Sequence, residues 1–289
     1  MPKLVDLLNK IRGSFKKEDN ATPEGETLES IIARLESDIT DGSWIYVNDA
    51  RTDLRMMPAL VEQANRKYPP MKLKFSATPK DLAISIKNAI NDGIQSSRFI
   101  ANIRNDGGIH FAVIDHKVIN NKASLILFES ATLNHTALGM FAVMAKTAFE
   151  KYRLPHCYFS IVEMDIQRSS YECGIFSLAL AKKLYLESDK LEKIHKDNID
   201  GVLYEPDTPF LSYDKLDKYL PVTFYKHTQS VNRLNKYLKS NPGAENEIIN
   251  KKDQTIFERF DNNSTVIGDK KLSVSPHKKR IYEYKSLMR

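Results

Sequence analysis

Cys173 is the residue whose type and setting could best support covalent chemistry. Ser169 and Glu172 precede it with the spacing of a helix capping box, which predicts a helix start and places Cys173 in the first helical turn. The positive end of the helix dipole favours a thiolate there, and Gly174 would let a substrate approach closely. A buried, inert cysteine at the head of a core helix fits the local sequence at least equally well, so the assignment needs partners.

His110 is the histidine best placed to act as a base for such a thiol. It follows Gly107-Gly108 and opens the apolar run HFAVIDHKV, which predicts a strand. An imidazole at a strand end beside a flexible glycine turn can reach out of the sheet. An ordinary strand-edge histidine would fit the same pattern.

The position of Glu129 relative to His110 follows from a predicted hairpin. Two apolar runs flank an Asn-Asn pair typical of a two-residue turn, and these segments are 110–118, 123–130 and 120–121. With the asparagines at the turn centre, Glu129 lies on the same face as His110, diagonal to it at about 7–8 Å. A carboxylate there can orient an imidazole, whereas a register shift of one residue would turn it to the other face.

Gln167 could supply the remaining group that acyl transfer requires. The reaction passes through a tetrahedral oxyanion, to which a glutamine amide and the backbone N–H of Cys173 can both donate. Gln167 stands six residues before Cys173. Taken alone, Gln167 would be interpreted as a surface loop residue.

The hydrophobic pattern around these residues predicts an α+β protein. We predict helices over residues 27–38, 57–68, 80–93, 136–152 and 172–187. We predict strands over residues 98–104, 110–118, 123–129 and 158–165. Pro58 stands near the start of the second helix, and the last helix is the most apolar and is expected to be buried.

The composition is that of an ordinary globular chain of 289 residues, of which 42% are apolar and 28% charged. Two cysteines, Cys157 and Cys173, make no disulfide framework, so a reactive thiol indicates a reducing, intracellular working site. Residues 1–26 are mostly polar and lack the apolar region of a signal peptide. Every apolar stretch is far shorter than the about 20 residues that a membrane-spanning helix needs.

The positive charge is concentrated in the last quarter of the chain. Residues Lys226 to Arg289 include 14 Lys+Arg and 7 Asp+Glu, and because the whole chain carries +6, the preceding residues carry −1. Such a surplus predicts either an anionic partner for this segment or a solvated basic face.

Many stretches of the chain resemble the YopJ family of bacterial type III secreted effectors. The order of the four residues discussed above is also similar to that of the clan CE cysteine proteases, which include the SUMO-specific Ulp proteases. The most specific stretch is VEMDIQRSSYECGIFSLALAKKL at 162–184. The others are DGSW at 42–45, MPALVEQAN at 57–65, SSRFI at 96–100, GGIHF at 107–111, LPVTFYKHTQ at 220–229, RFDNN at 259–263 and HKKRI at 277–281. Together they span roughly residues 29–289, and Tyr171 departs from the family, which has a small residue there.

The resemblance implies an acetyltransferase with a clan CE, Ulp-like catalytic core and a mostly helical regulatory module. Cys173 would be the nucleophile that takes acetyl from acetyl-coenzyme A, with His110 as the general base. Glu129 would orient the base, and Gln167 would donate to the oxyanion. Lys226 matches the family's autoacetylated lysine. The residues near the expected acetyl-coenzyme A site are Ser169, Lys182 and Lys183.

The resemblance also implies activation by inositol hexakisphosphate. A basic pocket formed by the terminal segments would suit this polyanion, and it would account for the uneven charge. The candidate contacts are Lys251, Lys252, Lys278, Lys279 and Arg280.

We expect four segments. They are a flexible N-terminal secretion segment (1–26), the N-terminal helical part of the regulatory module (27–75), the catalytic core (76–188) and a basic C-terminal regulatory region (189–289). The substrates implied by the family are Ser, Thr and Lys residues of host signalling kinases, namely MAP kinase kinases and IκB kinase, reached in the host cytoplasm after type III secretion. We expect a monomer, with no metal centre, no nucleic-acid partner and no membrane span.

Two other functions are compatible with the sequence. A cysteine protease or deubiquitinase of the same fold would use the same residues, because both reactions pass through a thioester. A non-enzymatic anion-binding module would use the basic C-terminal region, although no nucleic-acid-binding motif supports it.

Overall fold

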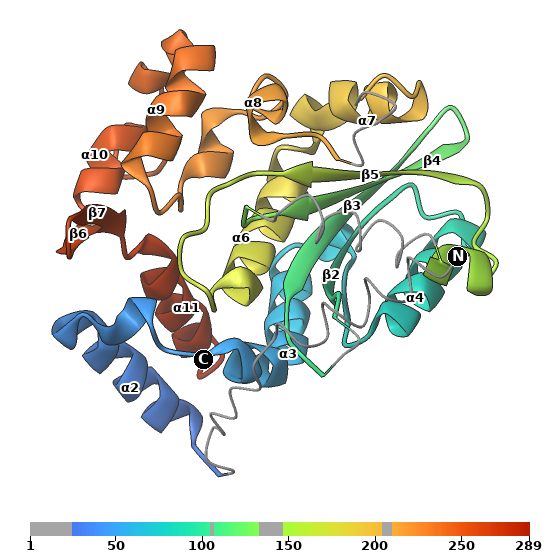
Figure 1. Cartoon of the computed structure of the whole chain (residues 1–289). Helices are drawn as coiled ribbons and strands as arrows, with labels where there is room; N and C mark the ends of the chain where they lie inside the picture. The colour runs from blue at the N-terminus through green and yellow to red at the C-terminus, as the bar shows by residue number, and fades with distance from the viewer. Residues whose placement is uncertain (1–24, 105–106, 133–146, 204–209) are drawn as a thin grey trace, which may run out of the picture.

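The computed structural model describes residues 25–104, 107–132, 147–203 and 210–289, and its centre is a five-stranded sheet (Figure 1). In spatial order the strands are β1 (Leu73–Ser76), β2 (Ser96–Asn102), β3 (Phe111–Ile119), β4 (Lys122–Glu129) and β5 (Cys157–Glu163). The outer strands run parallel to their neighbours, and the central three are antiparallel. The predicted α+β class is confirmed. The four predicted strands are confirmed as well, whereas the short β1 was not predicted.

The hairpin of β3 and β4 has the predicted register. Asn120 and Asn121 have φ values of 51° and 61°, as a type I′ turn requires at both central residues. Ile119 pairs with Lys122 at the turn. Because side chains alternate along a strand, this register fixes the face on which Glu129 lies at the end of β4.

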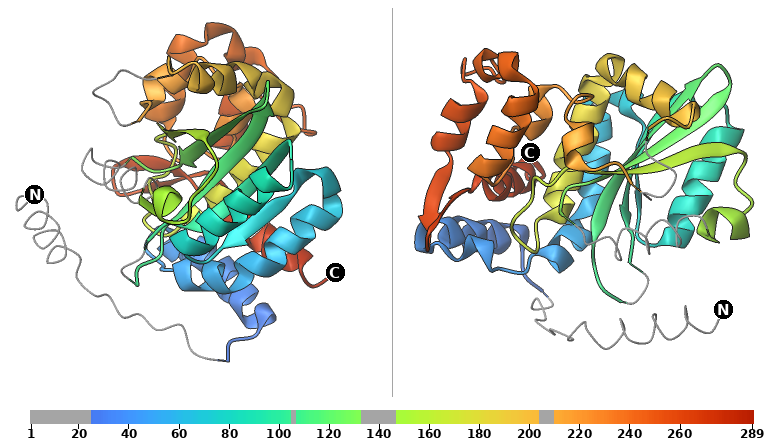
Figure 2. Two further views of the ribbon diagram at one scale, coloured as in Figure 1. Left: turned by 90° about the vertical axis from the view of Figure 1, so that its right-hand side faces the viewer. Right: turned by 45° about the horizontal axis from the view of Figure 1, so that its top comes forward.

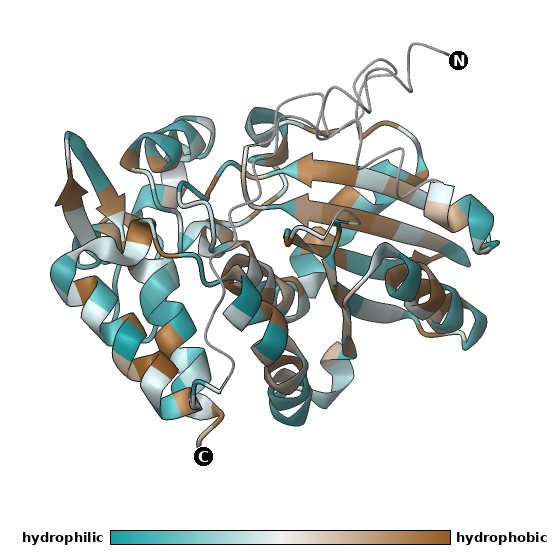
Figure 3. Ribbon diagram, turned by 60° about the horizontal axis from the view of Figure 1, so that its bottom comes forward, coloured by the Kyte–Doolittle hydropathy of each residue, from teal (hydrophilic) through white to brown (hydrophobic). Residues whose placement is uncertain are grey.

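Helices cover both faces of the sheet (Figures 1 and 2). Helices α3 (Ala50–Lys67) and α6 (Cys173–Leu186) pack on one face, and α4 (Pro79–Asn91) packs on the other. Ile126 of β4 belongs to the apolar cluster of α6, whereas its neighbour Leu125 belongs to that of α4. A strand buried on both faces must be apolar at successive positions, and Figure 3 shows the strands as mostly hydrophobic ribbon.

Side-chain caps mark the starts of α2 (Leu28–Asp41) and α4. The Oγ1 atom of Thr27 accepts a hydrogen bond from the backbone N–H of Ser30 at 3.2 Å, and Thr78 accepts one from Asp81 at 3.2 Å. Each bond satisfies an N–H group that has no partner within its helix. The helices predicted at these two places are confirmed.

The predicted start of α3 at residue 57 was wrong, because the helix begins at Ala50 and contains Pro58 in its interior. Its first half turns polar residues inward, and Thr52 and Asp53 are each 1% exposed. A search for apolar periodicity misses such a segment, since its buried positions are not hydrophobic.

The C-terminal residues form short helices and one small hairpin that pack beside the sheet and close to α2 (Figures 1 and 2). The helices are α7 (Glu192–Ile199), α8 (Tyr213–Leu216), α9 (Val231–Ser240), α10 (Ile256–Asp261) and α11 (Ser275–Ser286). The hairpin joins β6 (Ser264–Ile267) and β7 (Lys270–Ser273). The 3-10 turns are Ser43–Ile45, Pro69–Met71, Ser188–Leu191, Val222–Tyr225 and Pro242–Asn246.

One apolar cluster joins the N-terminal helices, the sheet and the C-terminal helices, from Ile31 to Tyr284. The segment boundary expected between residues 75 and 76 falls inside β1, so the two sides of that boundary share an element. Any catalytic core and regulatory module therefore share one hydrophobic interior.

Two predictions fall partly or wholly outside the described residues. The predicted mobile tail at 1–26 lies outside them up to residue 24, as does most of the helix predicted over 136–152, of which residues 147–151 are helical. Among the described helices, none combines the length and apolar character needed to cross a bilayer.

Gly174→Ala is expected to destabilise the fold, because a Cβ atom at Gly174 would lie 2.6 Å from Oδ2 of Asp53 and 2.9 Å from its Cβ. Relieving this clash must shift α6 against α3, which we expect to lower the free energy of unfolding by about 1–3 kcal/mol in chemical denaturation. Gly243→Ala is the control, since nothing lies within 4 Å of its added Cβ, and it should change stability by less than about 0.5 kcal/mol. Equal stability of the two variants would contradict the close packing at Gly174.

Candidate active site

Cys173 is the first residue of α6 and is 2% exposed. The backbone N–H of Phe111 points at its Sγ atom at 3.4 Å. The predicted helix start is confirmed, but the predicted capping box is wrong. Glu172 is the N-cap without a side-chain cap bond, and its Oε2 atom instead accepts from Oγ of Ser169 at 2.5 Å. Cys173 is the first residue of the helix, so its backbone N–H has no hydrogen-bond partner within the helix and lies at the positive end of the helix dipole.

His110 and Glu129 meet as the hairpin register predicts. The Nε2 atom of His110 lies 2.8 Å from Oε2 of Glu129, and Oε1 of Glu129 accepts from the backbone N–H of Ala131 at 2.8 Å. Burial lowers the pKa of His110. The charge of Glu129 and the hydrogen bonds to Cys173 and Glu129 raise it by more, so that the pKa lies well above its ordinary value. A protonated imidazole beside Cys173 stabilises a thiolate.

Asn102 holds the chain that leads into His110. Its Oδ1 atom accepts from the backbone N–H of His110 at 3.0 Å, and its Nδ2 atom donates to the carbonyl of Gly108 at 3.3 Å. The backbone N–H of Ile103 also donates to the carbonyl of His110 at 2.9 Å. Asn102 was not identified from the sequence, in which its only signal is its place shortly before the glycine turn.

Gln167 is buried in the segment before Cys173, with part of its amide already in use. Its Oε1 atom accepts from Oγ of Ser130 at 2.8 Å, and its Nε2 atom donates to the carbonyl of Ser169 at 2.6 Å. An amide nitrogen carries two hydrogens, so one of them is not used by these bonds. The side chain is therefore fixed, which a surface loop residue would not be.

Gln229 ties the segment before Cys173 to the C-terminal part of the chain. Its Oε1 atom accepts from the backbone N–H groups of Arg168 and Ser169, at 2.6 and 3.0 Å. Its Nε2 atom donates to Glu172 at 2.5 Å. Gln229 is fully buried and was not singled out from the sequence, although it ends the family-like stretch LPVTFYKHTQ.

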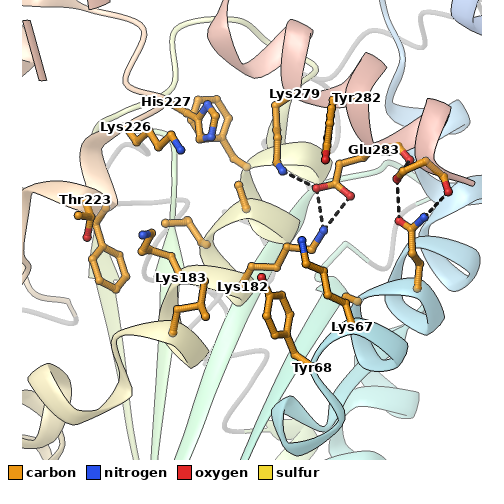
Figure 4. Close-up of a pocket in the computed structure, with 18 of the residues that line it drawn as sticks. Lys67, Tyr68, Lys182, Lys183, Thr223, Lys226, His227, Lys279, Tyr282 and Glu283 are labelled. Atoms are coloured by element: carbon orange, nitrogen blue, oxygen red, sulfur yellow. Dashed lines mark hydrogen bonds and ion pairs between the residues drawn. The ribbon is translucent and has the colours of Figure 1, made fainter. Parts of the chain in front are cut away.

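Five lysines line one cavity of about 380 Å³ between α3, α6, α11 and the turn at 222–225 (Figure 4). They are Lys67, Lys182, Lys183, Lys226 and Lys279. Four of them were expected from the sequence in three different roles, and Lys67 was not expected in any. The structure brings them together because four distant segments of the chain meet at this point.

The charge in this cavity, which we call the lysine pocket, is poorly balanced. Glu283 is the carboxylate in its lining, and it pairs with Lys182 at 2.7 Å and Lys279 at 2.5 Å. Burial and the nearby cations Arg259, Lys183 and Lys279 lower the pKa of Lys226 to about 8. Burial and neighbouring cations thus both disfavour the charged form of Lys226, and the cations are the part of this effect that an anion in the pocket would offset.

The other predicted ligand residues lie elsewhere. Lys251, Lys252 and Lys278 are exposed and do not line the lysine pocket, and Ser169 is buried against Glu172. Arg280 was a candidate contact of the activator, but it is 1% exposed and its guanidinium is already paired with carboxylates. Among the described residues, no group of three or more His, Cys, Asp or Glu could hold a metal ion.

Comparisons with known proteins agree along nearly the whole chain. The family model described as YopJ Serine/Threonine acetyltransferase matches residues 28–286. The chain is 56% identical to the serine/threonine-protein acetyltransferase YopJ of Yersinia pestis over 285 residues, which are 99% of this chain and 98% of the relative. YopJ of Yersinia pseudotuberculosis matches equally, at 56% identity over the same shares of both chains.

Two solved structures share the fold. AvrA delL154 with IP6 and CoA matches with a TM-score of 0.87 at 53% identity, over 93% of this chain and 100% of that chain. HopZ1a in complex with IP6 and CoA matches with a TM-score of 0.75 over 99% of this chain and 97% of that chain, but at 18% identity this likeness concerns the fold alone.

Glu129→Gln is expected to slow alkylation of Cys173 by iodoacetamide at pH 7 by at least about tenfold, since a neutral amide cannot hold His110 as an imidazolium. Because its pKa is raised, His110 should stay charged up to and above neutral pH in the wild type, whereas in the variant it should lose its proton as the pH rises toward neutrality, so the ratio of the two rates should grow from acid to neutral pH. Mass spectrometry separates Cys173 from Cys157, whose thiol pKa burial raises to about 11. Glu62→Gln, which alters an exposed pair with Arg66, should leave the rate unchanged. Equal alkylation rates in the wild type and in Glu129→Gln would argue against the role of Glu129 in keeping His110 charged.

Proposed function

The chain belongs to the YopJ serine/threonine acetyltransferase family, and we propose that it transfers acetyl from acetyl-coenzyme A to protein side chains through a thioester on Cys173. The observation that supports this mechanism most directly is the contact between His110 and Glu129 beside the head of α6. The enzyme is a serine/threonine acetyltransferase by family. The roles of its individual residues are our assignments.

In the first half of the reaction, the Cys173 thiolate attacks the carbonyl carbon of the acetyl thioester. Because Nε2 of His110 is engaged by Glu129, Nδ1 is the nitrogen that faces the reaction. The bond between the carbonyl carbon and the coenzyme sulfur breaks, and the His110 imidazolium gives its proton to the departing sulfur.

In the second half, the neutral His110 accepts the proton of a substrate hydroxyl whose oxygen attacks the acetyl group on Cys173. The carbon–sulfur bond breaks and the thiolate–imidazolium pair is restored. The backbone N–H of Cys173 and the unused amide hydrogen of Gln167 would stabilise the oxyanion in both halves.

We assign the lysine pocket to inositol hexakisphosphate. Its lining has five lysines and one glutamate, so it offers a surplus of four positive charges to a compact polyanion. AvrA, which is 53% identical to this chain, has been solved with this ligand. Lys182 and Lys183 then belong to the activator site rather than to the acetyl-coenzyme A site, and the buried Arg280 is not an activator contact.

Lys226 is our candidate for autoacetylation. An amine attacks a thioester only in its neutral form, and a pKa of about 8 leaves an appreciable neutral fraction near neutral pH. A bound polyanion would favour the charged ammonium again. Activator binding and acetylation of Lys226 should therefore oppose each other.

The cellular role rests on the family resemblance. We propose that the protein is secreted by a bacterial type III system into the host cytoplasm and acetylates Ser and Thr, and also Lys, of host signalling kinases such as MAP kinase kinases and IκB kinase. Elements outside the core of 76–188 would form the regulatory module. We propose a monomer that acts on proteins rather than nucleic acids.

Incubation with labelled acetyl-coenzyme A and inositol hexakisphosphate should label the wild-type protein on Cys173 and a MAP kinase kinase substrate on Ser or Thr. Cys173→Ala should abolish both labels, because no thiol then remains beside His110 to form the thioester. Gln167→Ala should slow transfer about 10²–10³-fold if its amide serves the oxyanion. Peptide or ubiquitin-linkage cleavage without acetyl label would favour the protease alternative.

Lys183→Gln combined with Lys226→Gln should weaken inositol hexakisphosphate binding in calorimetry by at least about a hundredfold, since removing each charged hydrogen bond costs about 1.5–3 kcal/mol. Lys251→Gln combined with Lys252→Gln removes the same charge from an exposed loop and is the matched control. If the control pair weakens binding more than the pocket pair, the activator binds elsewhere.

A further inference from the structure

Helix α11 presents two faces to two different sites. Residues Lys279, Glu283 and Ser286 line the lysine pocket, together with Tyr282. Arg280 and Tyr284 lie on the adjacent face and are buried at 1% and 0% exposure. Residues three and four apart share a face of a helix, so a rotation or shift of α11 would move both sets together.

The guanidinium of Arg280 makes a close set of buried contacts. Its Nε and Nη2 atoms donate to the two carboxylate oxygens of Asp53 at 3.0 and 3.1 Å, which is a bidentate pair. Its Nη1 atom donates to Asp49 at 3.3 Å, and Nη2 also donates to the carbonyl of Tyr171 at 2.8 Å. Tyr284 donates its hydroxyl to Oδ1 of Asp53 at 2.6 Å and so completes the cluster.

The residues that this cluster contacts lie on both sides of Cys173 in the sequence. Tyr171 and Glu172 precede the nucleophile, and Nη1 of Arg280 lies 3.9 Å from Oε1 of Glu172. Gly174 follows it, and Asp53 packs so closely there that an added Cβ would clash. Arg280 therefore touches the residues before the nucleophile directly and the residue after it through Asp53.

The cluster is sensitive to geometry because its charges are buried. Arg280 lies among Asp49, Asp53 and Glu172, of which Asp49 also pairs with Arg34, and burial raises the pKa of Glu172 to about 7 despite the nearby guanidinium. Water cannot replace a hydrogen bond that is broken at such depth, so a small displacement of Arg280 is costly. Such a group holds its neighbours in one arrangement.

We propose that Arg280 is a positioning residue for Cys173, and that α11 transmits occupation of the lysine pocket to the nucleophile through Arg280 and Asp53. This inference rests on the proposed function, because it takes the lysine pocket as the activator site. An anion that draws Lys279 and its helix toward the pocket would set the position of Arg280. The first turn of α6 would follow through the carbonyl of Tyr171.

The test is the rate at which iodoacetamide alkylates Cys173 in a Cys157→Ser background, measured with and without inositol hexakisphosphate. Two variants alter the cluster without altering the pocket lining. Arg280→Lys keeps the charge but removes the bidentate geometry, and Tyr284→Phe removes one buried hydrogen bond at nearly constant volume. Lys285→Gln is the control, since it removes an exposed ion pair between α11 and Glu36.

We expect the activator to raise the alkylation rate in the wild type and in Lys285→Gln to the same extent. In Arg280→Lys and Tyr284→Phe the activator-dependent rise should fall by about tenfold, while activator affinity in calorimetry stays within about threefold of the wild type. A merely structural defect would lower both the activator-dependent rise in alkylation and the affinity for the activator. Should Arg280→Lys fail to fold, Tyr284→Phe decides alone.

A wild-type response in the folded cluster variants would overturn the transmission through Arg280 and leave the proposed function intact. A parallel loss of affinity and response would also overturn it, because the pocket itself would then be damaged. No response of the wild type to the activator would reject the activator assignment and, with it, the transmission, even if acetyl transfer from labelled coenzyme is observed.

Discussion

The buried ion pair between Arg280 and Asp53 is the constraint on which the arrangement of this molecule depends. A guanidinium without water must find carboxylates, and those of Asp49 and Asp53 lie at the start of α3, more than two hundred residues away in the chain. Satisfying Arg280 therefore brings the last helix against α3 and both against the start of α6. The chain closes on itself around the residues that precede Cys173.

The basic surplus of the C-terminal quarter is divided among three environments. Arg233 and Arg280 are buried against carboxylates and carbonyl groups, where their charge stabilises the fold. Lys251 and Lys252 lie in solvent. Lys226 and Lys279 face the lysine pocket, where they join cations from α3 and α6. Net charge counted along the sequence could not separate these three groups, because burial decides which cation is available to a ligand.

The part of the site that local rules govern was predictable from the sequence. An Asn-Asn turn between two apolar strands fixes the register of the hairpin, and the register fixes the contact between His110 and Glu129. The head of α6 was predictable from the apolar run that follows it, although the capping box expected there is absent. The lysine pocket and the role of Gln229 were not, since they depend on contacts between segments that no short-range pattern relates. The start of α3 was missed because Asp53 is buried against Arg280, so polarity and burial do not coincide there.

The groups around Cys173 also divide into those held by local contacts and those held by distant contacts. His110 and Glu129 are held together by the β3–β4 hairpin and by Asn102 at the end of β2, so their contact is complete whenever the sheet is folded. The segment before the nucleophile is held by Gln229 and Arg280, both of which come from the C-terminal quarter. An enzyme built in this way can keep its base permanently in place and still let a distant ligand decide whether the thiol and its oxyanion donors are aligned. On the proposed function, regulation would act on the position of Cys173 rather than on its charge partner, and the placement of Lys279 and Arg280 next to each other on α11 suits that arrangement.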